Sequence, residues 1–77
     1  MSKRDIKLIL DDIIVASERI SEYIGKYSKE EFSSDQKTID AVIRNVEIIG
    51  EAVTQIPLEI QREFSEIPWS KIVGVSN

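Results

Sequence analysis

The side chains best suited to chemistry in this 77-residue sequence lie near its middle, in the run Arg44-Asn45-Val46-Glu47. At helical spacing, Arg44, Glu47 and Glu51 fall on one face of a helix. Asn45 falls at the edge of the apolar stripe, where a buried amide needs hydrogen-bond partners. A guanidinium and two carboxylates beside such an amide are suited to holding a polar ligand. The simpler alternative is a surface ion-pair stripe, worth a few tenths of a kcal/mol per pair, and the residues alone favour it.

Two acidic pairs, Asp11-Asp12 and Glu30-Glu31, are the next candidates, because paired carboxylates can perform acid–base catalysis. Adjacent residues of a helix point in different directions, so solvated surface is the better interpretation of both pairs. The sequence has no cysteine and no histidine, which excludes thiolate zinc sites, imidazole general bases and Ser–His triads for these residues. It also lacks a glycine-rich phosphate loop. We therefore predict no catalytic residue, no metal ligand and no cofactor.

The charge balance and the length limit what the chain can do by itself. Fourteen acidic residues outnumber ten basic ones, and the formal charge of −4 argues against a broad positive surface for nucleic acid. No apolar run approaches the roughly 20 residues that a membrane-spanning helix needs, so we expect a cytoplasmic protein without membrane association. A domain this small has a small core. Association between chains can bury additional apolar surface, so we expect a homo-oligomer.

The elements that would position these residues are helical. Apolar residues recur every three or four positions at the start of the chain and predict a first long helix over about 3–27. On its opposite side, Leu8 and Val15 are either two scattered exposed aliphatic residues or a second contact face for a partner helix. The polar residues 28–34 predict a loop with one short turn, anchored by Phe32.

A second long helix is predicted over about 35–56, because Pro57 pushes the residue before it out of the helical region. Gly50 inside this helix indicates close approach by another helix. A short helix is predicted over about 58–64, and a terminal helix from Pro68, a residue favoured in the first turn. No strand-like alternation occurs, so the predicted fold class is all-α.

Three runs of sequence carry a family resemblance. They are Leu10-Asp11-Asp12-Ile13, the central Arg44-Asn45-Val46-Glu47-Ile48-Ile49-Gly50-Glu51-Ala52, and Ile67-Pro68-Trp69 with Ile72 and Gly74. In these runs the chain resembles the HepT-like toxins of the HEPN superfamily over nearly its whole length. The resemblance implies an antiparallel HEPN-type helical bundle. It also implies that residues 1–77 form a single partial domain, incomplete at the C-terminus.

The resemblance implies a function as well. HepT-like toxins are dimers that cleave RNA without a metal ion, and they are encoded beside an MNT-type nucleotidyltransferase antitoxin in type VII toxin–antitoxin systems. Their catalytic motif is an arginine followed, four to six residues later, by a histidine and often a tyrosine. Ser76 stands where that arginine is expected, Asn77 matches the polar residue after it, and the histidine would lie beyond the chain. Unlike arginine, serine has no permanent positive charge and no planar set of N–H donors with which to bind a phosphate group.

Arg44, Asn45 and Glu47 match a recurrent family motif on the second helix. The resemblance implies that they line the cleft for RNA or the dimer cleft; alternatively, they brace the bundle. We predict a non-catalytic association fragment that binds itself, a full-length HepT-like chain or the cognate antitoxin. Two alternatives remain open: a complete toxin of which this chain is the N-terminal part, and a non-catalytic substrate-binding subunit of a nucleotidyltransferase.

Overall fold

The computed structural model describes residues 3–76, and within this range every regular element is a helix. The all-α prediction is therefore confirmed. The elements are α1 (Lys3–Gly25), α2 (Lys29–Ser34), α3 (Gln36–Thr54), α4 (Leu58–Glu63) and α5 (Trp69–Ser76). The two long helices end about two residues earlier than the sequence predicted.

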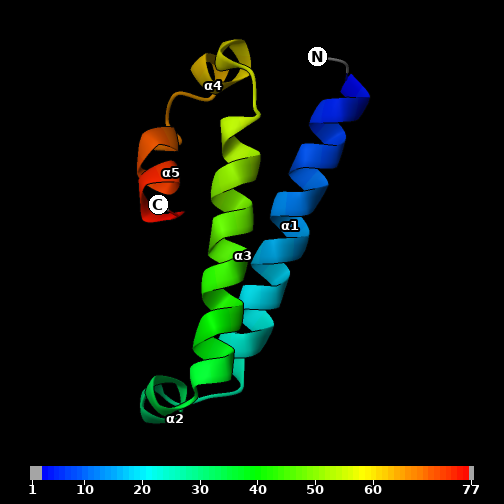
Figure 1. Ribbon diagram of the computed structural model, residues 1–77. Coiled ribbons are helices and arrows are strands. Elements are labelled where there is room, and N and C mark those ends of the chain that lie inside the picture. The colour runs from blue at the N-terminus through cyan, green and yellow to red at the C-terminus, as the bar shows by residue number, and fades with distance from the viewer. Residues whose placement is uncertain (1–2, 77) are drawn as a thin grey trace.

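Helix α3 is central to the fold, because α1 and α5 each pack along it and α2 contacts it. Figure 1 shows α1 and α3 running antiparallel, with α2 at one end of the pair and α4 at the other. Helix α5 then turns back and lies against α3 (Figure 1). The result is an elongated molecule of 42 × 22 × 18 Å.

The core lies where α1, the end of α3 and the start of α5 meet. Ile9, Ala52 and Ile56 form a buried cluster, with Ile13, Ile60 and Trp69 packed around it. Ala16 and Val53 are also buried. These residues fall at the three- and four-residue spacing that defines one face of each helix, as the sequence pattern predicted.

Residues 29–34 form the helix α2, with Ser28 as its N-cap, where the sequence predicted a loop with one short turn. The reason is that both of its ends are capped. Ser28 Oγ accepts a hydrogen bond from the backbone N–H of Glu31 at 3.2 Å, and Glu31 Oε1 accepts one from the Ser28 N–H at 2.9 Å. Asp35 ends α2 and caps α3, because its Oδ1 accepts from the Thr38 N–H at 3.1 Å. Phe32 is half-buried.

These two caps predict an acid-sensitive contribution to stability. The Ser28 N–H holds the pKa of Glu31 below its ordinary 4.5, and the Thr38 N–H holds the pKa of Asp35 below 3.8. Because both pKa values are lower in the folded state, the contribution is complete above the unfolded pKa values and is lost as pH falls through the folded ones. We expect the melting temperature to fall with decreasing pH below about 4, as circular dichroism would measure.

The control for this expectation is the double substitution of Glu31→Gln and Asp35→Asn. It removes both titrating groups but leaves the other carboxylates in place, so its melting temperature should depend less steeply on pH below about 4. Equal pH dependence of the two proteins would show that the caps carry none of the acid sensitivity.

The corner between α3 and α5 is built from side-chain hydrogen bonds to backbone carbonyls. Gln61 Nε2 donates to the carbonyl of Ile56 at 3.0 Å and so satisfies an acceptor just beyond the C-terminus of α3. Trp69 Nε1 donates to the carbonyls of Gln61 at 3.0 Å and Phe64 at 3.1 Å. The indole therefore joins the first residue of α5 to α4 and fixes where α5 begins.

Candidate functional site

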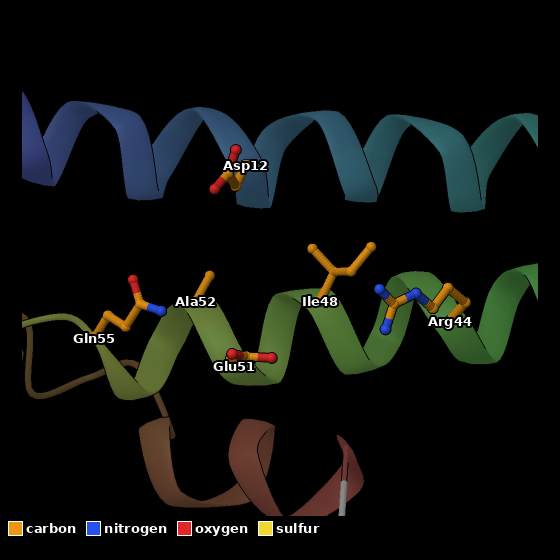
Figure 2. A pocket seen from close by; sticks show the side chains of 6 residues that line it. All are labelled: Asp12, Arg44, Ile48, Glu51, Ala52 and Gln55. Atoms are coloured by element: carbon orange, nitrogen blue, oxygen red, sulfur yellow. The ribbon is translucent and has the colours of Figure 1, made fainter.

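A polar pocket lies between the two long helices and contains Arg44, one of the three predicted cleft residues. It has a volume of about 180 Å³ and is lined by Asp12, Arg44, Ile48, Glu51, Ala52 and Gln55. Figure 2 shows that Asp12 comes from α1, while Arg44, Ile48, Glu51 and Ala52 lie along α3 and Gln55 directly follows its last residue. The α3 residues repeat at helical spacing over three turns, so a single face of that helix forms one wall.

Arg44 is the cationic group of this pocket, which also contains the carboxylates of Asp12 and Glu51. Its Nη1 atom lies 4.0 Å from Oε2 of Glu47, and these two side chains are 71% and 50% exposed. An ion pair this long and this exposed contributes little to stability. The guanidinium therefore keeps most of its donors available to a ligand, while Asp12 and Glu51 offer acceptors farther along the same pocket (Figure 2).

Asn45 has a different environment from its neighbour Arg44. It is only 5% exposed, and its Nδ2 donates to the carbonyl of Ala41 at 2.8 Å. Its Oδ1 is buried and has no hydrogen-bond partner among the described residues. The structure therefore places Arg44 and Glu47 at the surface and Asn45 inside the helix packing. That all three line one cleft stays a prediction.

The two remaining predicted positions lie at the end of the chain. Asn77 lies outside the described residues, and Ser76 is the last residue of α5. Within the described range, no group of three or more acidic side chains is placed to hold a metal ion. In that same range, no helix is both long enough and apolar enough to cross a membrane.

The pocket also contains residues that the sequence patterns did not single out as a site. Asp12 looked like solvated surface, and Gln55 and Ile48 looked like ordinary helix residues. One signal was available: Leu8 and Val15 follow the same face of α1 as Asp12 and remain 55% and 44% exposed. Helical periodicity is enough to show that two apolar residues flank Asp12 on one face of α1. It does not show which residues of α3 lie across from that face.

The fold and this pocket define an all-helical domain with a mixed-charge surface between its long helices. The family model of ribonuclease HepT-like proteins matches residues 13–77. The chain belongs to the ribonuclease HepT-like family, as the resemblance predicted.

Curated relatives support this assignment over most of the chain. A putative RNase of Methanocaldococcus jannaschii is 38% identical over 77 residues, covering 100% of this chain and 71% of that protein. The probable ribonuclease HepT of Thermococcus cleftensis is 46% identical over 70 residues, or 91% of this chain and 64% of that protein. A gamma-glutamylcyclotransferase and putative RNase of M. jannaschii is 36% identical over 69 residues, or 90% of this chain and 31% of that protein.

This chain thus spans between about a third and about seven-tenths of the length of these three relatives. No solved structure matches it significantly.

Proposed function

We propose that this chain is the RNA-binding scaffold of a HepT-like ribonuclease fold, and that these 77 residues bind RNA and associate without cleaving it. The observation that carries the proposal is Arg44, whose exposed guanidinium lines a pocket that also contains two carboxylates. A guanidinium is suited to a phosphate oxygen, and neighbouring carboxylates accept hydrogen bonds from 2′-hydroxyl or base amino groups. Single-stranded RNA presents all of these groups.

The absence of cleavage follows from the side chains in these 77 residues. There is no histidine to transfer a proton near neutral pH, and Ser76 stands where the family resemblance expects a catalytic arginine. Neither serine nor asparagine stabilises a developing phosphorane charge as a guanidinium does.

The biological setting that we propose is a cytoplasmic type VII toxin–antitoxin system. In it, this chain forms a homodimer and contacts an MNT-type nucleotidyltransferase antitoxin. The family assignment supports this setting, and the small core supports self-association.

RNA binding and RNA cleavage are tested on the same polypeptide. Fluorescence anisotropy with a labelled single-stranded RNA of mixed sequence should give a Kd that rises about tenfold in Arg44→Ala, because one charge-assisted hydrogen bond is lost. Arg62→Ala is the matched control, since Arg62 is exposed on α4 and does not line the pocket. Its Kd should change less than about twofold.

Cleavage is followed on the same RNA by gel electrophoresis in the presence of a chelator. We expect no product above the buffer control. Metal-independent cleavage by this polypeptide would contradict the non-catalytic part of the proposal. Equal Kd values for wild type and Arg44→Ala would contradict the part that concerns the pocket.

A further inference from the structure

The lining of the polar pocket changes in chemical character along α3. Arg44 lies at one end, and its guanidinium supplies N–H donors. Ile48 follows one turn later, and Glu51 lies two turns from Arg44, about 10 Å along the helix axis. Figure 2 shows Asp12 of α1 near the level of Glu51, away from Arg44. The pocket therefore combines a cationic donor at one end with two anionic acceptors farther along.

The size and polarity of the pocket limit what it can hold. Its volume of about 180 Å³ lies below the roughly 300–1,000 Å³ of sites for drug-sized molecules, so it suits a group of the size of a single ring system. Ile48 and Ala52 are the apolar members of the lining and can contact the face of a ring. An occupant that matches the whole pocket carries an anionic group for Arg44, a ring, and hydrogen-bond donors for the carboxylates.

A nucleotide has these parts in this order. Its phosphate is the anionic group, the ribose follows, and the base ends in a polar edge that is accessible in single-stranded RNA. An RNA strand is built from such units, so the inference that follows rests on the proposed RNA binding. The four bases differ in what their Watson–Crick edges offer to a carboxylate, which accepts hydrogen bonds but donates none.

Guanine is the base whose edge matches two carboxylates. It presents two adjacent donors, the N1–H and the N2 amino group. Adenine and cytosine each present an amino group beside a ring nitrogen that accepts, and uracil presents one N–H flanked by two carbonyl oxygens. In those three bases an acceptor would face a carboxylate, and neither group would be paired. A site built to bind a particular donor discriminates strongly against a ligand that lacks it.

We propose that the polar pocket is a guanosine subsite for RNA, in which the carboxylates of Asp12 and Glu51 accept the N1–H and N2 amino hydrogen atoms of guanine while Arg44 binds the phosphate. Asp12 and Glu51 determine specificity in this arrangement, because they contact the base. Arg44 contributes affinity without selecting a sequence, because every nucleotide carries the same phosphate. The two roles can therefore be separated by experiment.

Fluorescence anisotropy with labelled oligouridylate RNAs that differ in one central nucleoside tests the proposal. We expect the RNA with a central guanosine to bind about tenfold more tightly than those with adenosine, cytidine or uridine there. An RNA with inosine, which lacks only the N2 amino group, should bind about threefold more weakly than the guanosine RNA, because one of the two hydrogen bonds remains. Arg44→Ala should weaken the binding of all these RNAs by a similar factor and keep their ranking.

Variants of the two carboxylates give the sharpest comparison. Asp12→Ala and Glu51→Ala each remove one acceptor, so the preference for guanosine should fall from about tenfold to about threefold. Asp11→Ala is the matched control, since Asp11 is an exposed neighbour on α1 that does not line the pocket. It removes the same charge and should leave the preference unchanged. All three side chains are exposed, so the variants should fold, which circular dichroism verifies.

Competition with guanosine 5′-monophosphate and adenosine 5′-monophosphate separates RNA from a free nucleotide as the source of the base. We expect unlabelled guanosine RNA to displace the labelled RNA best, followed by the guanosine compound and then the adenosine compound. If guanosine 5′-monophosphate competes as well as the RNA, the assignment of the subsite to RNA is wrong. Equal binding of all RNAs that still depends on Arg44 would overturn the guanosine subsite and leave the proposed function intact. Failure to bind any of the RNAs would overturn both.

Discussion

Replacing Trp69 with alanine is expected to lower the free energy of unfolding by about 3–4 kcal/mol. The indole packs against the buried cluster formed by Ile9, Ala52 and Ile56, so truncation leaves a cavity beside the core. It also removes the donor that satisfies two carbonyls of the α4 corner. A domain of 77 residues has a total stability of about 4–11 kcal/mol, so this one substitution removes a large share of it.

Chemical denaturation followed by circular dichroism measures this loss of stability. One further variant separates the contribution of packing from that of the hydrogen bonds, and another serves as a control. Trp69→Phe keeps most of the packing but not the N–H, so it should cost about 1–2 kcal/mol. Leu58→Ala is the control, because Leu58 belongs to the same corner but is 64% exposed. Its cost should stay below about 0.5 kcal/mol. If Trp69→Ala costs no more than Leu58→Ala, the indole does not support the start of α5.

Local sequence signals predicted the main elements well, because each rests on the chemistry of one or two residues. Pro57 separates α3 from α4, and Pro68 precedes α5 directly. The apolar repeats of α1 and α3 identify the buried face, on which Ile9 and Ile56 lie. The predicted close approach at Gly50 agrees with the burial of that residue in α3. Periodicity and proline position are properties of the local chain, so they can be read without a structure.

Features that depend on long-range partners were not predictable in the same way. Residues 29–34 were predicted as a loop, but caps at both Ser28 and Asp35 make them a helix. Gln61 of α4 donates to the carbonyl of Ile56, just beyond the end of α3, and no spacing rule predicts that contact. The polar pocket combines Asp12 of α1 with Arg44 and Glu51 of α3, and only the antiparallel pairing of these helices places the three residues in one pocket.

Replacing Asn45 is also expected to change the free energy of unfolding substantially. Whether the free energy rises or falls depends on the residue that is introduced. The buried Oδ1 has no hydrogen-bond partner among the described residues, which costs about 1–3 kcal/mol relative to a satisfied group. Asn45→Leu, of similar size, removes this cost and should raise the free energy of unfolding by about 1 kcal/mol. Asn45→Asp leaves an uncompensated charge in the same place and should lower the free energy of unfolding by about 3 kcal/mol or more near neutral pH.

The pH dependence of the aspartate variant checks this reasoning independently. Burial raises the pKa of an aspartate, so the folded state binds a proton more tightly than the unfolded state does. The stability that this variant loses relative to the wild type should therefore be smallest at acid pH, and it should grow as the pH rises from the unfolded value of about 4 toward the raised folded value. Denaturant titrations of both variants at two pH values measure these effects. A loss of stability in Asn45→Leu would show that the amide braces the bundle. A gain of stability would show that the amide of Asn45 destabilises the fold. A residue that destabilises the fold in this way is expected to serve binding or association instead.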